Sequence, residues 1–177
     1  ATLPVSALLE LCKGVLDATV QCGARVMGGD MSLSSEMSIS ATAFGSVQKD
    51  KMLRRSGALP GDSVFISRSL GLTPSALHYC VKPELFGGFE ASEVDLLRGQ
   101  FTKLSPMVTL GHSLAASGDC SAAMDNTDGV WQSFDELSQE SKVGIVIAKE
   151  MLRIPPLVTK AARCVDADST QLALGPG

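Results

Sequence analysis

Apolar residues recur at three- and four-residue intervals in several segments, and this spacing places them on one face of a helix. In the first such segment, residues 5–22, the face begins with Leu8, Leu9 and Cys12. The same spacing predicts further helices over residues 74–81, 91–98, 107–117, 130–141 and 157–164. The chain beyond residue 60 is therefore expected to be richer in helix than the part before it.

Other segments show the two-residue period of a β-strand. Met37, Ile39, Ala41 and Ala43 alternate with serine and threonine, which predicts a strand with one buried face over residues 37–47. Short apolar runs predict three more strands, over residues 24–27, 64–66 and 143–148. Together the helices and strands predict an α+β fold with mixed sheets covered on one side by helices.

A proline- and glycine-rich turn interrupts the chain near residue 60, in the run Ser56-Gly57-Ala58-Leu59-Pro60-Gly61-Asp62. We place a domain boundary here, which gives residues 1–60 and residues 61–177. The sequence begins without Met, in what looks like the first turn of a helix, and it ends in a glycine-rich stretch. The chain is therefore expected to be a fragment of a longer protein.

Composition and charge argue against several classes of function. The net charge of −4 does not suit a surface that neutralises nucleic-acid phosphates. No apolar stretch reaches the roughly 18–20 residues of a membrane-spanning helix, and no basic segment precedes the first apolar run. Five cysteines, an odd number without a C-x-x-C pair, suggest reduced thiols in the cytoplasm. His78 and His112 lie among apolar and small residues and do not indicate a metal site or a catalytic triad.

Two acidic segments are candidates for phosphate chemistry. Gly28-Gly29-Asp30 combines exposed backbone N–H groups with a carboxylate that could hold Mg²⁺, although an ordinary turn is the simpler interpretation. Asp125 and Asp128 lie three residues apart, with the Thr127 hydroxyl between them, just before a predicted helix. They could bind a cation and a phosphate, or Thr127 or Asp128 could simply cap the helix. Neither alternative leads.

Arg55 precedes the Ser-Gly turn and could clamp a nucleotide phosphate. From the residue type alone, a solvated side chain at the end of a strand is the simpler interpretation.

In this order along the chain, these segments resemble the motifs of thiamine-monophosphate kinases. That family belongs to a superfamily with aminoimidazole ribonucleotide synthetase and selenophosphate synthetase. Four runs carry the resemblance: Val26-Met27-Gly28-Gly29-Asp30-Met31-Ser32, Leu53-Arg54-Arg55-Ser56-Gly57-Ala58-Leu59-Pro60-Gly61-Asp62, Ala123-Met124-Asp125-Asn126-Thr127-Asp128-Gly129-Val130 and Leu172-Ala173-Leu174-Gly175-Pro176-Gly177. The resemblance implies the end of the family's amino-terminal domain and the start of its carboxy-terminal domain, about half of a family-length chain.

The resemblance further implies an enzyme that uses ATP and Mg²⁺ to convert thiamine monophosphate to thiamine diphosphate by in-line phosphoryl transfer. Asp30, Asp125 and Asp128 would hold Mg²⁺, and the two aspartates of the second pair would be the catalytic residues. Gly28, Gly29, Asp30, Arg55 and Thr127 would bind ATP. Aspartates bridged to phosphates by Mg²⁺ suit a reaction that needs alignment and charge neutralisation. A homodimer paired through residues 37–47 is also implied, and these 177 residues alone are expected to have little or no kinase activity.

The sequence departs from the family pattern at three positions. Met31 replaces the usual threonine, Asn126 replaces an apolar residue, and Met107 follows Pro106 where the family carries arginine. These departures keep two alternatives open: a sister ATP-dependent enzyme of the superfamily, or a degenerate relative that binds nucleotide or acts as a scaffold without catalysis.

Overall fold

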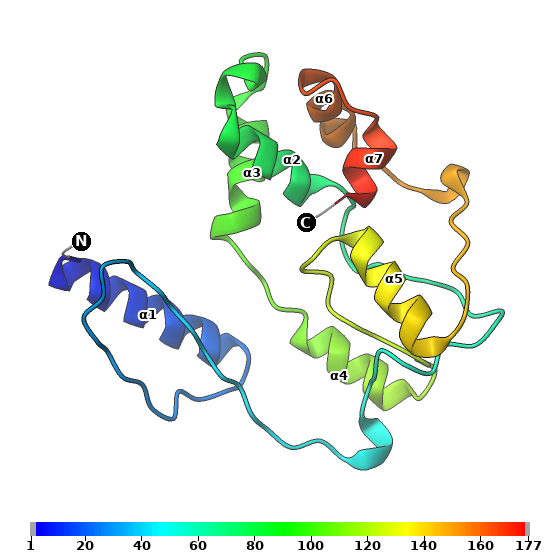
Figure 1. The fold of residues 1–177 in the computed structure, drawn as a ribbon, viewed down its shortest axis with the longest axis horizontal. Helices are drawn as coiled ribbons and strands as arrows, with labels where there is room; N and C mark the ends of the chain where they lie inside the picture. The colour runs from blue at the N-terminus through cyan, green and yellow to red at the C-terminus, as the bar shows by residue number, and fades with distance from the viewer. Residues whose placement is uncertain (1–2, 176–177) are drawn as a thin grey trace.

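The computed structural model describes residues 3–175, and in this range the chain forms helices joined by long irregular segments (Figure 1). The α-helices are α1 (Val5–Gln21), α2 (Leu72–Val81), α3 (Ala91–Thr102), α4 (Val108–Ser117), α5 (Val130–Ser141), α6 (Pro156–Cys164) and α7 (Ser169–Leu174). Three short 3₁₀ helices are η1 (Lys49–Lys51), η2 (Pro83–Phe86) and η3 (Lys149–Met151).

The six helices predicted from apolar spacing are confirmed as α1 to α6. The sequence did not predict α7, because a helix of six residues is too short to show a period. Its start is fixed locally by Asp168, whose carboxylate accepts hydrogen bonds from the backbone N–H groups of Thr170 and Gln171. Of the carboxy-terminal run that carries part of the resemblance, Pro176 and Gly177 lie outside the described residues.

The predicted α+β fold with mixed sheets is wrong for the described structure, because residues 3–175 contain no β-strand. Residues 25–47 make no backbone–backbone hydrogen bond with any described segment, and such bonds define a sheet. The alternating apolar side chains are exposed, at 71% for Met37 and 60% for Ile39. Residues 24–27, 64–66 and 143–148 are likewise irregular. A two-residue period defines an apolar face but supplies no partner strand.

The main core lies where α2, α3, α6 and α7 meet, in the upper part of Figure 1. Leu97 of α3 and Val158 of α6 are fully buried there, and Phe86 of η2 packs beside them. Gly71 enters α2 with a φ of +79°, and a Cβ at this position would lie 2.7 Å from Val158 Cγ1. Glycine therefore allows both the left-handed backbone and the close packing of the segment against α6.

Polar contacts reinforce the same core at its edge. The Lys160 ammonium of α6 donates a 2.5 Å hydrogen bond to the Glu93 carboxylate of α3 and lies 4.4 Å from the centre of the Phe89 ring. The bond from Lys160 is the largest of the contacts that lower the pKa of Glu93. These contacts tie α3 to α6 across 67 residues of sequence.

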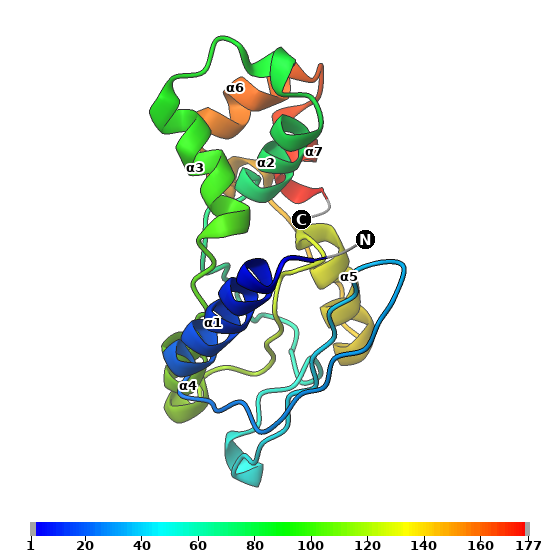
Figure 2. The same ribbon diagram turned by 90° about the vertical axis from the view of Figure 1, so that its left-hand side faces the viewer.

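A second, smaller apolar cluster connects α5 to this core. Val130 at the start of α5 packs with Leu70 and with Ala173 of α7. Figure 2 shows the main helical cluster at one end of the molecule and α1 and α4 toward the other. Helix α1 buries none of its residues. The domain boundary near residue 60 stays a prediction. None of the helices formed by residues 3–175 combines the length and apolar character that crossing a bilayer requires.

Candidate functional site

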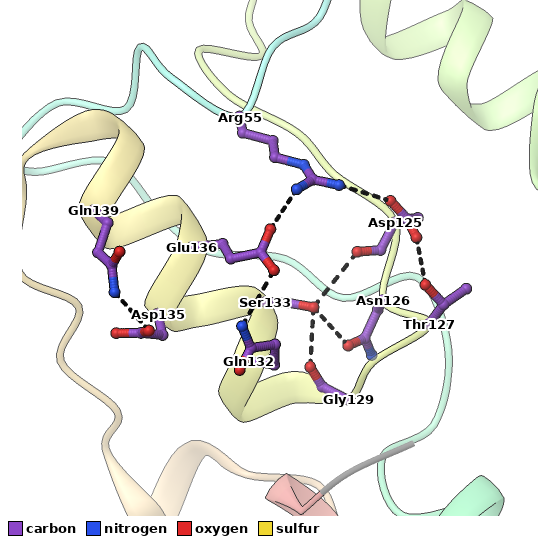
Figure 3. Close-up of polar contacts among 10 residues, drawn as sticks. All are labelled: Arg55, Asp125, Asn126, Thr127, Gly129, Gln132, Ser133, Asp135, Glu136 and Gln139. Carbon is purple, nitrogen blue, oxygen red and sulfur yellow. Dashed lines mark hydrogen bonds and ion pairs between the residues drawn. The ribbon is translucent and has the colours of Figure 1, made fainter.

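Two loops that are far apart in sequence meet beside α5: residues 54–62 and residues 119–129 (Figure 3). The Ala123 N–H donates a 2.8 Å hydrogen bond to the Arg54 carbonyl. A Cβ at Gly57, whose φ is +123°, would lie 2.6 Å from the Ser121 carbonyl oxygen. The two loops therefore touch through their backbones, and only glycine fits at the point of contact.

Asp62 closes the turn of the first loop and ties it to the second. Its carboxylate accepts hydrogen bonds from the Leu59 N–H at 2.9 Å and from the Ser121 hydroxyl at 2.6 Å. The bond from Ser121, and after it the bond from Leu59, lowers the pKa of Asp62. Because these bonds favour the charged carboxylate, their contribution to stability is present above the unfolded-state pKa and is lost as the pH falls through the lower folded-state pKa.

Arg55 lies between two carboxylates in Figure 3. Its guanidinium forms an ion pair with Glu136 of α5, and a second guanidinium nitrogen is 3.8 Å from Asp125 Oδ1. The Arg55 side chain is 51% exposed, so the cation can still be reached from solvent. The structure thus brings together Arg55 and Asp125, two of the residues predicted for the site.

Thr127 is also part of this group. Its hydroxyl donates a 2.5 Å hydrogen bond to Asp125 Oδ2, and this bond is the largest of the contacts that lower the pKa of Asp125. Backbone N–H groups lower the pKa further, burial opposes them, and the charge of Arg55 makes a smaller contribution that also lowers it. The Asp125 side chain is 62% exposed, so an ionised carboxylate faces solvent and can accept a cation.

The capping alternative for this segment is wrong. The N-cap of α5 is Gly129, and no side chain caps the helix. Ser133, within the first turn, instead donates toward the Gly129 carbonyl and the Asn126 side chain, each at 3.0 Å. Asp128 is exposed. Thr127 and Asp128 are therefore not engaged in capping, and the cation and phosphate interpretation remains.

The remaining predicted residues lie elsewhere. Gly28, Gly29 and Asp30 are in the long irregular segment that follows α1, and the Asp30 carboxylate accepts a 2.8 Å hydrogen bond from the next backbone N–H, that of Met31. Within residues 3–175 no three His, Cys, Asp or Glu side chains lie close enough together to hold a metal ion. The joint role of Asp30, Asp125 and Asp128 stays a prediction.

Sequence reasoning missed three residues that organise the site. Glu136 forms an ion pair with Arg55, and Ser121 donates a hydrogen bond to Asp62. Ser141, the last residue of α5, forms hydrogen bonds with the backbone of the first loop. The sequence does show that Gln132 and Glu136, four residues apart, share one helical face. It does not show that this face meets Arg55, because that contact joins distant parts of the chain.

A further contact lies at Met107, one of the three positions where the sequence departs from the family pattern, which has arginine here. The Arg68 guanidinium donates a 2.5 Å hydrogen bond to the Ser105 carbonyl and lies 3.6 Å from the Met107 sulfur. A cation from another segment therefore lies beside residues 105–107.

Replacing Gly57 with alanine is expected to destabilise the protein by about 2–3 kcal/mol, because a side chain at this φ is strained and its Cβ meets Ser121. Gly61→Ala is the matched control: its φ is +100°, but nothing lies within 4 Å of the added Cβ. It should show only the conformational cost, about 1 kcal/mol. Urea unfolding measures both, and equal effects would contradict the close contact with Ser121.

Proteins bind phosphates with carboxylates that hold a divalent cation and with hydroxyl and guanidinium groups that donate directly to the phosphate oxygens, and the converging loops carry all three kinds of group. Comparison with curated protein sequences narrows this class of phosphate-binding proteins to one kind of kinase. The chain is 31% identical over 170 residues to thiamine-monophosphate kinase of Halobacterium salinarum. The aligned region covers 96% of this chain and 53% of that protein. It is 29% identical over 168 residues to the thiamine-monophosphate kinase of Methanopyrus kandleri, covering 95% and 52%.

A shorter match is to selenide, water dikinase 2 of Peptoclostridium acidaminophilum, 34% identical over 67 residues, covering 38% of this chain and 19% of that protein. No family model and no solved structure matches the chain. The chain spans about half the length of the thiamine-monophosphate kinases it matches. The resemblance indicated by the four motifs is confirmed: the chain is a homologue of thiamine-monophosphate kinases.

Proposed function

We propose that this chain forms part of a kinase that uses ATP and Mg²⁺ to phosphorylate thiamine monophosphate to thiamine diphosphate. The observation that carries the proposal is the meeting of the two motif loops, with Arg55 3.8 Å from an exposed Asp125 whose pKa is lowered. The matches to thiamine-monophosphate kinases over nearly the whole chain support this assignment of substrate.

The side chains at the site suit Mg²⁺, which prefers carboxylate and water oxygens. Asp125 and Asp128 of the site would hold it together with Asp30 of the segment that follows α1, and when bound it would neutralise charge on the transferring phosphate. Asp125 offers a carboxylate that its neighbours keep ionised, since the Thr127 hydroxyl, backbone N–H groups and Arg55 all favour the charged form. This site therefore has the anionic charge that a hard cation requires.

The other residues act by positioning the phosphates. Arg55 presents a planar guanidinium that can bind phosphate oxygens in pairs. The Thr127 hydroxyl and the backbone N–H groups of Gly28 and Gly29 would contact ATP phosphates. Phosphoryl transfer needs no protein nucleophile, so aligned donors and carboxylates are sufficient equipment for an in-line reaction.

The experiment that tests the reaction incubates the longest native form of the chain with ATP, Mg²⁺ and thiamine monophosphate. Chromatography should detect thiamine diphosphate and ADP. A protein that binds ATP but makes no thiamine diphosphate would contradict the proposed substrate. It would then favour a sister enzyme of the superfamily, an alternative supported by the match to selenide, water dikinase 2.

A non-catalytic nucleotide-binding relative is separated by ligand binding alone. ADP with Mg²⁺ at about 100 times its dissociation constant should stabilise the protein by about 2.7 kcal/mol and raise its melting temperature. The shift should depend on Mg²⁺. The absence of a shift with ADP and Mg²⁺ in the longest native form of the chain would favour the scaffold over the kinase.

Two finer features belong to the same proposal. The exposed apolar side chains of residues 37–47 support a homodimer paired through this segment, and sedimentation at the mass of one chain would contradict it.

All five cysteines are free thiols, which supports a reducing, cytoplasmic setting.

A further inference from the structure

Helix α5 holds Arg55 at both its main chain and its side chain. The Ser141 hydroxyl donates a 3.1 Å hydrogen bond to the Arg55 carbonyl and accepts one of 3.2 Å from the Ala58 N–H. Five residues earlier on the same helix, Glu136 forms the ion pair with the Arg55 guanidinium. The position of this cation is therefore set by α5 and not by its own loop.

Glu136 is itself held in place. Its Oε1 accepts a 3.2 Å hydrogen bond from the Gln132 side chain, one turn earlier on α5, while Oε2 faces Arg55. The Glu136 side chain is 26% exposed, against 62% for Asp125, so water screens its charge less. Figure 3 shows the guanidinium between these two carboxylates. Of the two, Glu136 is the fixed and closer partner of Arg55.

This arrangement affects how Asp125 can be used. A guanidinium without Glu136 would have Asp125 as its nearest carboxylate, already only 3.8 Å away. Arg55 would then compete with any cation for the same oxygens, since both are attracted by one negative charge. With Glu136 present, Arg55 stays beside the site while the Asp125 carboxylate remains open.

We propose that Glu136 is a positioning residue that keeps Arg55 off Asp125, so that Asp125 can bind Mg²⁺ and Arg55 can bind the nucleotide phosphate. This inference rests on the proposed function. It assigns a role to a residue outside the four motif runs, on the face of a helix that follows the third of them.

The test compares Glu136→Gln with Asp135→Asn, a matched loss of one charge at the adjacent position, where the side chain bonds to Gln139 instead. ADP is titrated at several Mg²⁺ concentrations by calorimetry, with fluorescence of Trp131, the single tryptophan, as a second signal. Glu136→Gln should raise the Mg²⁺ concentration for half-maximal ADP binding about fivefold, the size expected for a partly exposed ion pair. Asp135→Asn should leave it unchanged.

A double variant separates positioning from general damage. If Arg55 competes for Asp125, Glu136→Gln should not change the Mg²⁺ requirement further once Arg55→Ala has removed the cation. Glu136→Asp, which retains the charge, should recover most of the wild-type Mg²⁺ response. A Glu136→Gln protein that loses its helical circular dichroism while Glu136→Asp keeps it would show that Glu136 is needed for folding and overturn the positioning role.

The outcomes distinguish the two proposals. If the wild-type protein does not bind ADP at any Mg²⁺ concentration, the proposed function fails and the role of Glu136 fails with it. If the wild type binds ADP and Glu136→Gln responds to Mg²⁺ as Asp135→Asn does, only the role of Glu136 is wrong.

Discussion

Asp125→Asn is expected to lower thiamine diphosphate formation by about a thousandfold. The substitution keeps the shape of the side chain and an oxygen that can accept the Thr127 hydrogen bond, but it removes the charge. A carboxylate that binds Mg²⁺ contributes through the ion to stabilising the transferring phosphate, an effect of several kcal/mol, and each 1.36 kcal/mol is about tenfold in rate. The initial rate of product formation by the longest native form of the chain, at saturating ATP, measures the loss.

Asp119→Asn is the control for this experiment. Asp119 is an exposed carboxylate in the same loop, so its replacement also removes one negative charge. Its rate should stay close to that of the wild type. A similar loss in both variants would indicate a general electrostatic effect of the loop. An Asp125→Asn protein with full activity would show that this carboxylate does not bind the essential cation.

Leu97→Ala is expected to lower the free energy of unfolding by about 2–5 kcal/mol. Leu97 is fully buried where α2, α3, α6 and η2 meet, so truncation loses apolar contact and leaves a cavity. The preceding residue supplies the control, because Leu96 is 49% exposed and faces away from this core. Its replacement by alanine should cost about 0.5 kcal/mol or less.

Urea unfolding followed by circular dichroism compares the two leucine variants at equal helix propensity and equal change in side-chain volume. A large difference between them confirms that the helical cluster is the stable core of the chain. Equal effects would mean that α3 is not packed with this face inward. Because α5 joins the cluster through Val130 and Ala173, the Leu97 variant should also weaken the site at low urea concentrations.

The helices could be predicted because a helix satisfies its own backbone hydrogen bonds and shows its buried face as a local period. Residues 130–141 illustrate this, since the predicted bounds are those of α5. The strands predicted from alternation are wrong, because a strand does not satisfy its own backbone hydrogen bonds. Residues 37–47 carry a clear alternation, yet a strand exists only with a neighbour, and no described segment pairs with them.

The candidate site likewise has features that the local sequence determines and contacts that only the tertiary structure determines. The sequence by itself determined the helical segments, the likeness to thiamine-monophosphate kinases and the short motifs that contain Arg55, Asp125 and Thr127, because each depends on residues close together along the chain. Only the tertiary structure decided that Arg55 faces Asp125, that Ser121 meets Asp62 and that Glu136 holds the guanidinium. These contacts join residues 59 to 81 positions apart, and no local pattern specifies which distant groups packing brings together.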